Sequence, residues 1–267
     1  MKIGFIGAGK MATALVNGIV SSKLVPSNDV FVTDINADAT AKLKQELNVS
    51  VADSVENMLS KVDIVITAVG PKVAPQILSG IKDELFKDKT VVSIAAGLQL
   101  DTLAAALPVK TPIVRIMPNI NAVVGEAAIA LCTNDYVEDG VKADVKKIFE
   151  SVGTVYELPE SQFSIFTAIS GSSPAYAYLF IDSIARGAVK NGMSKDLATK
   201  IAAEAVLGSA KMIKETGEEP WTLINNVSSP GGTTVAGLVE LEDNAFISTV
   251  IKGIDATINK DKELSGK

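Results

Sequence analysis

The chain has 267 residues, of which 25 are Lys or Arg and 31 are Asp or Glu, so its formal net charge is −6. This acidic balance argues against a nucleic-acid partner, because clustered Lys and Arg supply most of that affinity. The chain has one cysteine, Cys132, and no histidine. The composition therefore excludes Ser-His-Asp and Cys-His nucleophiles, and we expect no metal site.

Short β-rich runs alternate with helical patterns through the first half of the chain. The pattern predicts a first helix over Met11–Val20. The predicted strands are, in chain order, Lys2–Ile6, Val30–Thr33, Asp63–Val69, Thr90–Ile94 and Pro112–Ile116, with Glu126–Cys132 and Gly153–Tyr156 extending the sheet at one edge. Because these strands are apolar on both faces, we expect an α/β fold of the Rossmann type, with a doubly wound sheet covered by helices on each side.

From about Ser161 the β-branched runs give way to Ala-rich helical patterns such as Asp196–Lys214 and Asn244–Lys260. We therefore divide the chain into a sheet domain, residues 1–160, and an all-helical domain, residues 161–267. The most apolar stretch, Phe163–Ala185, is interrupted by polar residues, whereas a membrane span needs about 20 mostly apolar residues. We expect a buried helix there and no membrane partner. The apolar start of the chain, without a charged leader, favours a cytoplasmic location.

A glycine motif follows the first predicted strand and opens the first predicted helix. Residues 6–12 read IGAGKMA, which gives the G-x-G-x-x-A fingerprint of dinucleotide binding in the strand-turn-helix context that it requires. Gly7 permits the tight turn, and Gly9 lets a pyrophosphate approach the backbone at the helix N-terminus. The motif predicts a dinucleotide cofactor, and a glycine turn without a ligand is the alternative. The predicted contacts in this loop are Ile6, Gly7, Ala8, Gly9, Lys10 and Met11.

Other cofactor contacts are expected where later strands end. Asp34 follows a strand, and an acidic residue there accepts hydrogen bonds from the adenosine ribose and repels a 2′-phosphate, which favours NADH over NADPH. A local turn before Asn36 explains an aspartate at this position equally well. Two loops of small residues at strand ends leave room for a dinucleotide, although ordinary loop geometry also accounts for them. Their predicted contacts are Ala68, Val69, Gly70 and Ala96.

Two motifs in the helical domain are rich in hydroxyl groups and glycine. In Ser170–Tyr176, which reads SGSSPAY, the proline suits the first turn of a helix and Ser172 or Ser173 suits its cap. Asn226–Thr234 reads NVSSPGGTT and leads into a helix with an apolar face. Free N–H groups at a helix start, together with hydroxyl groups, make an anion site the size of a carboxylate.

With these pieces in place, the sequence strongly resembles the pyrroline-5-carboxylate reductase family nearly end to end. The resemblance rests on the opening IGFIGAGKMA, on AVGP at 68–71, AAG at 95–97, RIMPN at 115–119, SGSSPAY and, most specifically, SPGGTT at 229–234. It implies the reduction of L-1-pyrroline-5-carboxylate to L-proline, the last step of proline biosynthesis. NADPH or NADH would be the cofactor, and the helical domain would be a dimerisation domain.

The same resemblance assigns residues to the substrate. It implies that the SPGGTT loop holds the substrate carboxylate and ring near the nicotinamide, with Asn226 near the cofactor and Thr234 beside the ring nitrogen. The implied substrate residues are Ser229, Gly231, Gly232, Thr233 and Thr234. The family often has lysine where Gly70 stands, and Ser or Asn where Asp34 stands. Both departures count against an assignment of NADP as the cofactor.

The chemistry open to this chain agrees with imine reduction. Oxidation of an alcohol calls for a general base of near-neutral pKa, usually His or Lys, and the chain has no histidine. Reduction of a cyclic imine demands less, because the imine nitrogen can arrive protonated and hydride then goes to C5. The protein mainly supplies position, a dry site and a hydrogen bond from Thr234 or a water. We expect Thr234 to orient the iminium and not to act as an obligatory acid.

Two other functions are weighed against this one. A 3-hydroxyacid dehydrogenase of the β-hydroxyisobutyrate type also pairs these two domains, but Pro174–Ala188 lacks the lysine that such an enzyme needs there. A non-catalytic dinucleotide sensor would have no need of the SPGGTT anion site.

Apolar segments such as Ile201–Leu207 exceed what a small helical domain buries, which predicts a homo-oligomer. A dimer is the minimal unit that the resemblance implies, and a decamer of dimers is the larger alternative.

Overall fold

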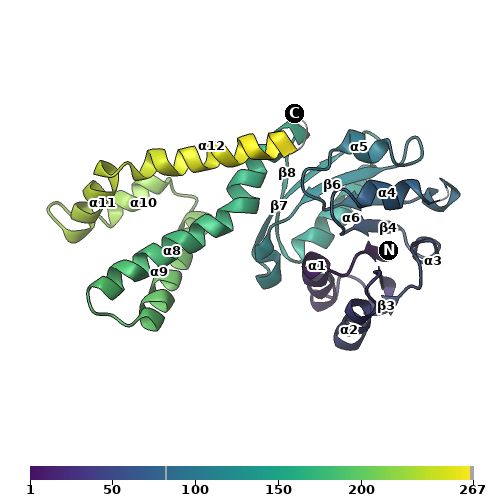
Figure 1. The fold of residues 1–267 in the computed structure, drawn as a ribbon, viewed down its shortest axis with the longest axis horizontal. Coiled ribbons are helices and arrows are strands. Elements are labelled where there is room, and N and C mark those ends of the chain that lie inside the picture. Colours follow the sequence, from purple (N-terminus) through teal and green to yellow (C-terminus); the bar gives the residue numbers. More distant parts are fainter. Residues whose placement is uncertain (82, 265–267) are drawn as a thin grey trace. The chain divides into compact units, whose positions relative to one another are not determined.

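The computed structural model describes residues 1–81 and 83–264. The chain forms two compact units, one made of residues 1–171 together with the C-terminal residues from 258, the other of residues 172–257 (Figure 1). The first unit thus continues past the predicted domain boundary at Glu160 as far as Gly171.

A single sheet forms the centre of the first unit. Its strands are β1 (Ile3–Ile6), β2 (Val30–Thr33), β3 (Ser50–Val51), β4 (Ile64–Thr67), β5 (Thr90–Ser93), β6 (Ile113–Met117), β7 (Ala127–Thr133) and β8 (Gly153–Glu157). Their order in the sheet is β3-β2-β1-β4-β5-β6-β7-β8. Neighbouring strands are parallel except β6 and β7, which are antiparallel. The predicted Rossmann-type sheet is confirmed, and β3 is a strand that the sequence pattern did not predict.

Helices cover both faces of this sheet. The core on one face packs the strands against α1 (Lys10–Ser21), α2 (Ala37–Leu47) and α6 (Asp139–Glu150). The core on the other face packs them against α3 (Val55–Leu59), α4 (Ala74–Ser79) and α5 (Leu100–Ala104). Short 3₁₀ turns complete the unit at η1 (Ser27–Asp29), η2 (Asp83–Phe86), η3 (Ile120–Val124) and η4 (Glu160–Gln162).

The two cores follow from the alternation of side chains along each strand. In β1, Ile3 and Phe5 point into the core that contains α1, and Ile6 points into the opposite one. Phe5 and Phe149 are fully buried on the first side, and Met58 is fully buried on the second. Each such side chain contributes roughly 1.5–3 kcal/mol when it leaves water. Burial on both faces fixes the register and so fixes which residues emerge at the carboxyl ends of the strands.

The helical part of the chain begins inside the first unit with α7 (Phe163–Phe166) and a π-helix (Thr167–Ser172). It continues with α8 (Ser173–Lys190), α9 (Lys195–Thr216), α10 (Pro220–Asn226), α11 (Thr233–Asp243) and α12 (Phe246–Leu264). In the second unit α8 and α9 form an antiparallel pair that packs through the small side chains Ala185, Ala198 and Ala202 (Figure 1). These alanines allow the two helix backbones to approach closely.

The stretch Phe163–Ala185 is helical and is mostly buried as far as Ser170, but the prediction of a buried helix is wrong for α8 in the single chain. Large apolar side chains of α8 face solvent, among them Tyr178 and Leu179, and Leu179 is 68% exposed. The second unit has too few residues of its own to cover them. Across the described residues, no helix has the length and apolarity that crossing a membrane requires.

Candidate active site

The glycine loop joins β1 to α1 in a conformation that requires glycine at its first position. Gly7 has φ +107°, and its N–H donates to the carbonyl oxygen of Thr33 at 2.8 Å. A Cβ on Gly7 would lie only 2.7 Å from the carbonyl oxygen of Ala68. Gly7 therefore fixes a tight turn that locks the ends of three neighbouring strands, β1, β2 and β4, together.

Gly9 has a different environment, because open space surrounds it. A Cβ built on Gly9 would meet no heavy atom within 4 Å, and Gly9 is the N-cap residue of α1. It has no side chain to accept hydrogen bonds from the first N–H groups of the helix, so these donors face outward beside an accessible backbone. This arrangement fits a pyrophosphate, which needs both close approach and helix N-terminal donors.

A cavity of about 300 Å³ opens where β1, β2 and β4 end. It brings together four residues predicted from the sequence, Ile6, Gly7, Asp34 and Val69. The remaining lining residues, none of them predicted, are Thr33, Ile35, Asp53, Ser54, Val55, Val73 and Ile77. Ile35 is fully exposed at 107% and offers an apolar surface to a ligand. The cavity lies where the strand order reverses around β1, the position at which open α/β sheets bind ligands.

The carboxylate of Asp34 is held by two backbone N–H groups. Its Oδ2 accepts from Ala8 at 2.6 Å, and its Oδ1 accepts from Asn36 at 2.8 Å. The bond from Asn36 forms the local turn that the sequence analysis gave as one explanation for an aspartate at this position. The first bond ties Asp34 to the glycine loop, across 26 positions of the chain. Asp34 thus stabilises the glycine loop and the local turn, and it also lines the cavity. A structural role and a contact with a ligand are therefore compatible at this position.

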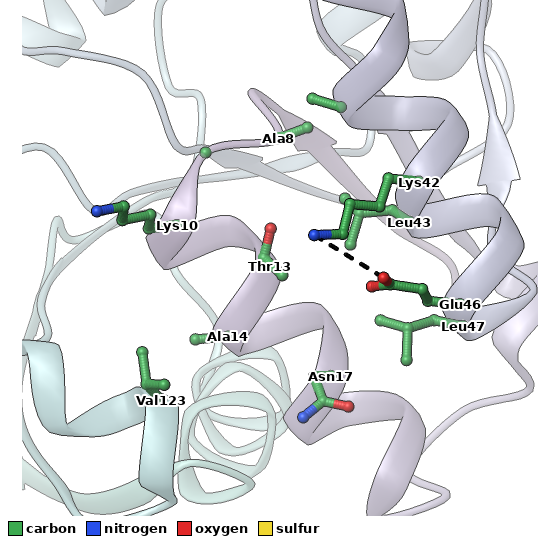
Figure 2. Close-up of a pocket in the computed structure, with 12 residues that line it drawn as sticks. Ala8, Lys10, Thr13, Ala14, Asn17, Lys42, Leu43, Glu46, Leu47 and Val123 are labelled. Carbon is green, nitrogen blue, oxygen red and sulfur yellow. Dashed lines mark ion pairs between the residues drawn. The ribbon is translucent and has the colours of Figure 1, made fainter.

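A larger cavity of about 720 Å³ lies between α1 and α2 on the other side of the glycine loop (Figure 2). The predicted residues Ala8, Gly9 and Lys10 line it. Figure 2 shows Lys42 and Thr13 pointing into the space between the helices, whereas Lys10 points away from it. Lys42 forms an exposed ion pair with Glu46, with 3.8 Å between Nζ and Oε1.

The other predicted cofactor residues of this unit lie in the same loop or at the same edge of the sheet. Met11 and Ala68 pack against the core that contains α1. Gly70 and Ala96 are exposed just after β4 and β5. The carbonyl oxygen of Gly70 accepts hydrogen bonds from the backbone of Val73 and Ala74, which starts α4 beside the smaller cavity. Their exposure leaves this edge open to a ligand.

The segment after β6 holds an unusual buried amide. The Nδ2 of Asn119 donates to the carbonyl oxygen and to the Oγ of Ser170, at 3.1 and 3.3 Å. Asn119 is only 6% exposed, and its Oδ1 is buried without a hydrogen-bond partner among the described residues. In the sequence, Asn119 is marked only as the last residue of the RIMPN motif, with no role predicted for its side chain. A buried acceptor without a partner is rare in proteins, so this amide, just after β6, is an unusual feature of the first unit.

The start of α8 agrees with the sequence prediction at Pro174 and departs from it at Ser172, one of the two serines expected as a cap. Pro174 lies in the first turn as predicted, but the side chain of Ser172 makes no capping hydrogen bond. The chain is already helical through the π-helix that precedes α8, so no free N-terminus needs a cap there. The π-helix packs against the last residue of β6, since a Cβ on Gly171 would lie 3.2 Å from Met117 Cε. Single π-turns inside helices often mark functional sites.

The hydroxyl-rich motif of the second unit forms a loop at the N-terminus of α11. Gly231 has φ +69°, and Gly232, the N-cap residue, donates its N–H to the carbonyl oxygen of Ser229 at 2.9 Å. A Cβ on Gly232 would lie 2.4 Å from Ser229 Oγ, so a side chain there would displace the Ser229 hydroxyl. Thr233 and Thr234 occupy the first turn of this helix of 11 residues and are exposed. Asn226 ends α10 and is exposed as well.

Several residues that line the smaller cavity were not predicted, because their place depends on strand pairing. Asp53 follows β3, and a strand of two residues is too short to show any periodicity. Ser54 accepts a hydrogen bond from the backbone N–H of Asn57 and caps α3. That cap is the one sequence signal that could have marked the end of a strand before it.

Comparison with known proteins gives a consistent result. A family model described as pyrroline-5-carboxylate reductase dimerisation matches residues 160–264, and one described as NADP oxidoreductase, coenzyme F420-dependent, matches residues 2–97. The chain is 39% identical to pyrroline-5-carboxylate reductase of Escherichia coli (strain K12) over 264 residues, which cover 99% of this chain and 98% of that protein.

Solved structures show the same likeness. A crystal structure of Plasmodium falciparum pyrroline carboxylate reductase with NADP bound matches with a TM-score of 0.87 and 34% identity, and covers 99% of this chain and 98% of that one. The structure of a pyrroline-5-carboxylate reductase from Coxiella burnetii matches with a TM-score of 0.94 and 30% identity, and covers 98% of each chain.

Proposed function

The chain belongs to the pyrroline-5-carboxylate reductase family, and from that premise we propose which of its residues bind the cofactor and the substrate. The enzyme reduces L-1-pyrroline-5-carboxylate to L-proline with NAD(P)H, the last step of proline biosynthesis. NAD(P)H supplies the hydride. The protein has to hold the cofactor, hold the imine and keep water away while the transfer occurs.

The glycine loop and the smaller cavity form the cofactor site in this proposal. The open backbone at Gly9 and the free donors at the start of α1 support binding of the pyrophosphate there. Asp34 and the apolar wall of the cavity would hold the adenosine half. Gly70 and Ala96, which are exposed after β4 and β5, would leave room for the other half. Asn226 is assigned to the cofactor as well.

The loop at the start of α11 forms the substrate site in this proposal. The single observation that carries it is that the hydroxyl groups and glycines of SPGGTT gather at a helix N-terminus whose N-cap residue has no side chain. The exposed N–H groups there suit the carboxylate of the substrate. Ser229, Thr233 and Thr234 add hydroxyl groups around it, and Gly231 and Gly232 form the turn. Thr234 would hydrogen-bond the ring nitrogen.

The reaction asks little acid-base chemistry of these residues. A protonated imine accepts hydride at C5, the C=N double bond becomes a single bond, and the proton stays on the nitrogen. No histidine is present in the chain, and none is needed, because the substrate brings its own proton. The role of Thr234 is to orient the ring so that C5 faces the hydride donor.

The test is the initial rate of NADH and NADPH oxidation at ~340 nm with pyrroline-5-carboxylate, in the wild type and in two variants of Thr234. Thr234→Val keeps the shape but removes the hydroxyl, so it should lower kcat/KM by about tenfold, the worth of one good hydrogen bond. Thr234→Ser should keep most of the activity. Full turnover and full substrate affinity in Thr234→Val would contradict the orienting role.

The assembly and location belong to the same proposal. The enzyme acts on a small molecule and is an oligomer. We propose a dimer as its minimal unit and a decamer of dimers as its larger form. We propose that the enzyme lies in the cytoplasm. Its single cysteine forms no disulfide within the chain, so its fold does not depend on an oxidising compartment. The net charge of −6 gives no support to a nucleic-acid partner. Sedimentation at several protein concentrations and cell fractionation test these assignments.

A further inference from the structure

We propose that Asp53, together with Asp34, makes the adenosine end of the cofactor site select NADH against NADPH. The inference rests on the proposed cofactor site and adds to it a specificity-determining residue. It starts from the pairing of two strand ends at the edge of the sheet.

The sheet register sets the two carboxylates beside each other. β2 and β3 are parallel neighbours, with Phe31 opposite Ser50 and Val32 opposite Val51. The hydrogen bond from the N–H of Ala52 to the carbonyl oxygen of Val32 continues the ladder. Continuing this register two positions beyond its last pair sets Asp53 opposite Asp34. Neighbouring strands lie about 4.8 Å apart and opposite residues share a face, so both carboxylates reach the cavity that they line.

Asp34 cannot swing away from this position. Both of its oxygens accept backbone N–H groups, one from Ala8 in the glycine loop and one from Asn36 at the start of α2. A carboxylate has about four acceptor positions, so roughly half of them stay free. These can accept the 2′- and 3′-hydroxyl groups of a ribose. A 2′-phosphate would have to lie against an anion that the backbone holds in place.

Nothing in the cavity compensates for this negative charge. Among the described residues that line it, none is Lys or Arg. The glycine-loop lysine, Lys10, and Lys42 of α2 line the separate cavity between α1 and α2, and Lys42 is already paired with Glu46. The rest of the wall is largely apolar, with Ile35 and Val73 among its members. An apolar wall of this kind binds the adenine of either cofactor equally, so the choice between them depends on the carboxylates.

The size of the effect follows from charge. A phosphate monoester carries a charge of about −1.5 to −2 at pH 7. At separations of a few ångströms and the effective dielectric of a protein surface, repulsion from one carboxylate is large enough to weaken binding by about tenfold or more. We therefore expect the wild type to bind NADH at least about tenfold more tightly than NADPH at low ionic strength. Added salt should narrow that difference.

The experiment measures equilibrium binding to the full chain, without substrate, by titration calorimetry. The ligands are NADH, NADPH and two fragments that reach only this end, ADP and adenosine 2′,5′-bisphosphate. Asp53→Asn keeps the side-chain size and touches none of the bonds that hold the glycine loop. It should tighten NADPH and the bisphosphate by about tenfold and leave NADH within about twofold. Retained NADH affinity also shows that the variant is folded.

Two further variants make the result specific. Asp135→Asn removes the same charge from an exposed residue just after β7. Because β7 runs antiparallel to β6, Asp135 lies near the amino-terminal ends of the parallel strands, away from the cavity at their carboxyl ends. This variant should change neither affinity. Asp34→Asn should weaken NADH, because an amide cannot accept from both Ala8 and Asn36 and offers fewer acceptors to the ribose.

Two results would overturn the inference. If the wild type binds NADPH as tightly as NADH, the site does not select NADH and the proposal fails. If Asp53→Asn leaves the affinities for NADPH and the bisphosphate unchanged, Asp53 has no part in it. Neither result touches the proposed function, which fails only if pyrroline-5-carboxylate is not reduced with either cofactor.

Discussion

The guanidinium of Arg115 and the carboxylate of Glu160 form a largely buried ion pair, with 2.7 Å between Nη1 and Oε1. Arg115 lies in β6 and is only 6% exposed. The same Oε1 accepts the backbone N–H of Leu100 at 2.8 Å, and the guanidinium lies over the ring of Phe163, 4.5 Å from its centroid. One pair thus ties β6 to the start of α5 and to α7.

Removing one charge of this pair should destabilise the fold. Glu160→Gln leaves the Arg115 cation buried without its partner, and we expect a loss of about 3 kcal/mol in the free energy of unfolding, measured by urea denaturation. Glu46→Gln, at the exposed pair with Lys42, is the matched control and should cost less than about 1 kcal/mol. Equal losses in the two variants would show that burial does not set the strength of the Arg115 pair.

The two glycines of the cofactor loop should respond differently to substitution. Gly7→Ala places a methyl group 2.7 Å from the Ala68 carbonyl oxygen at φ +107°, so we expect a loss of about 2 kcal/mol or more in the free energy of unfolding. Gly9→Ala meets no atom within 4 Å and should leave stability almost unchanged.

Dinucleotide binding should be sensitive to substitution of Gly9, although stability is not. The open space there is where the pyrophosphate approaches the backbone in the proposed site, and a methyl group would block that approach. We expect Gly9→Ala to weaken NADH binding by about tenfold or more while its thermal unfolding midpoint stays that of the wild type. Unchanged NADH affinity in Gly9→Ala would move the pyrophosphate away from this loop.

The sequence predicts the strands that carry long apolar runs and misses the one that does not. β1, β2 and β4–β6 lie where β-branched runs mark them, because burial on both faces leaves a continuous signal. The predicted extensions at one side of the sheet, β7 and β8, are strands as well, although β8 is mostly exposed. β3 has two residues, and its place in the sheet comes from pairing with β2 and not from its own pattern. The order of strands around β1 is likewise a product of long-range contacts, which no local pattern encodes.

The same division holds for the candidate site. Gly7, Gly9 and Asp34 belong to a contiguous motif or to a strand end, so their chemistry can be predicted from neighbours in the chain. Asp53 enters the cavity through the register of β3, and the buried Oδ1 of Asn119 is exceptional only because of what surrounds it. Ser172, one of the two serines expected as a cap, makes no capping hydrogen bond for a related reason: the π-helix before α8 has no counterpart in sequence propensity.

Cys132 should be chemically inert in the folded protein. It lies in β7 opposite Arg115, and burial, followed by the charge of Glu160, raises the pKa of its thiol to about 12, with Arg115 opposing the shift. An unfolded thiol has a pKa near about 8.5. We expect alkylation by iodoacetamide at about pH 8 to be roughly a hundredfold slower in buffer than in urea, because the thiolate is the reactive form.

The same shift gives a sign for the dependence of stability on pH. Below the unfolded pKa both states hold the proton, and the contribution of Cys132 to stability is fully present. As pH rises from about 8.5 toward about 12, the unfolded chain loses the proton first and the fold is weakened. Cys132→Ser should therefore show a shallower loss of stability over this range in denaturation experiments. An identical slope would exclude the thiol as its source.

The exposed apolar side chains of the helical unit should hold the oligomer together. Leu207 of α9 is 60% exposed in the single chain, and it lies inside the region that matches a dimerisation family. Monomeric proteins rarely leave contiguous apolar surface of this kind uncovered. We expect the wild type to be a dimer or larger at micromolar concentration, and Leu207→Glu to shift it toward monomer in light scattering, because an unpaired charge would be buried at the interface. Val109→Glu replaces a side chain that is 90% exposed in the first unit and should leave the molar mass unchanged. A shift of both variants to monomer, or of neither, would place the interface elsewhere.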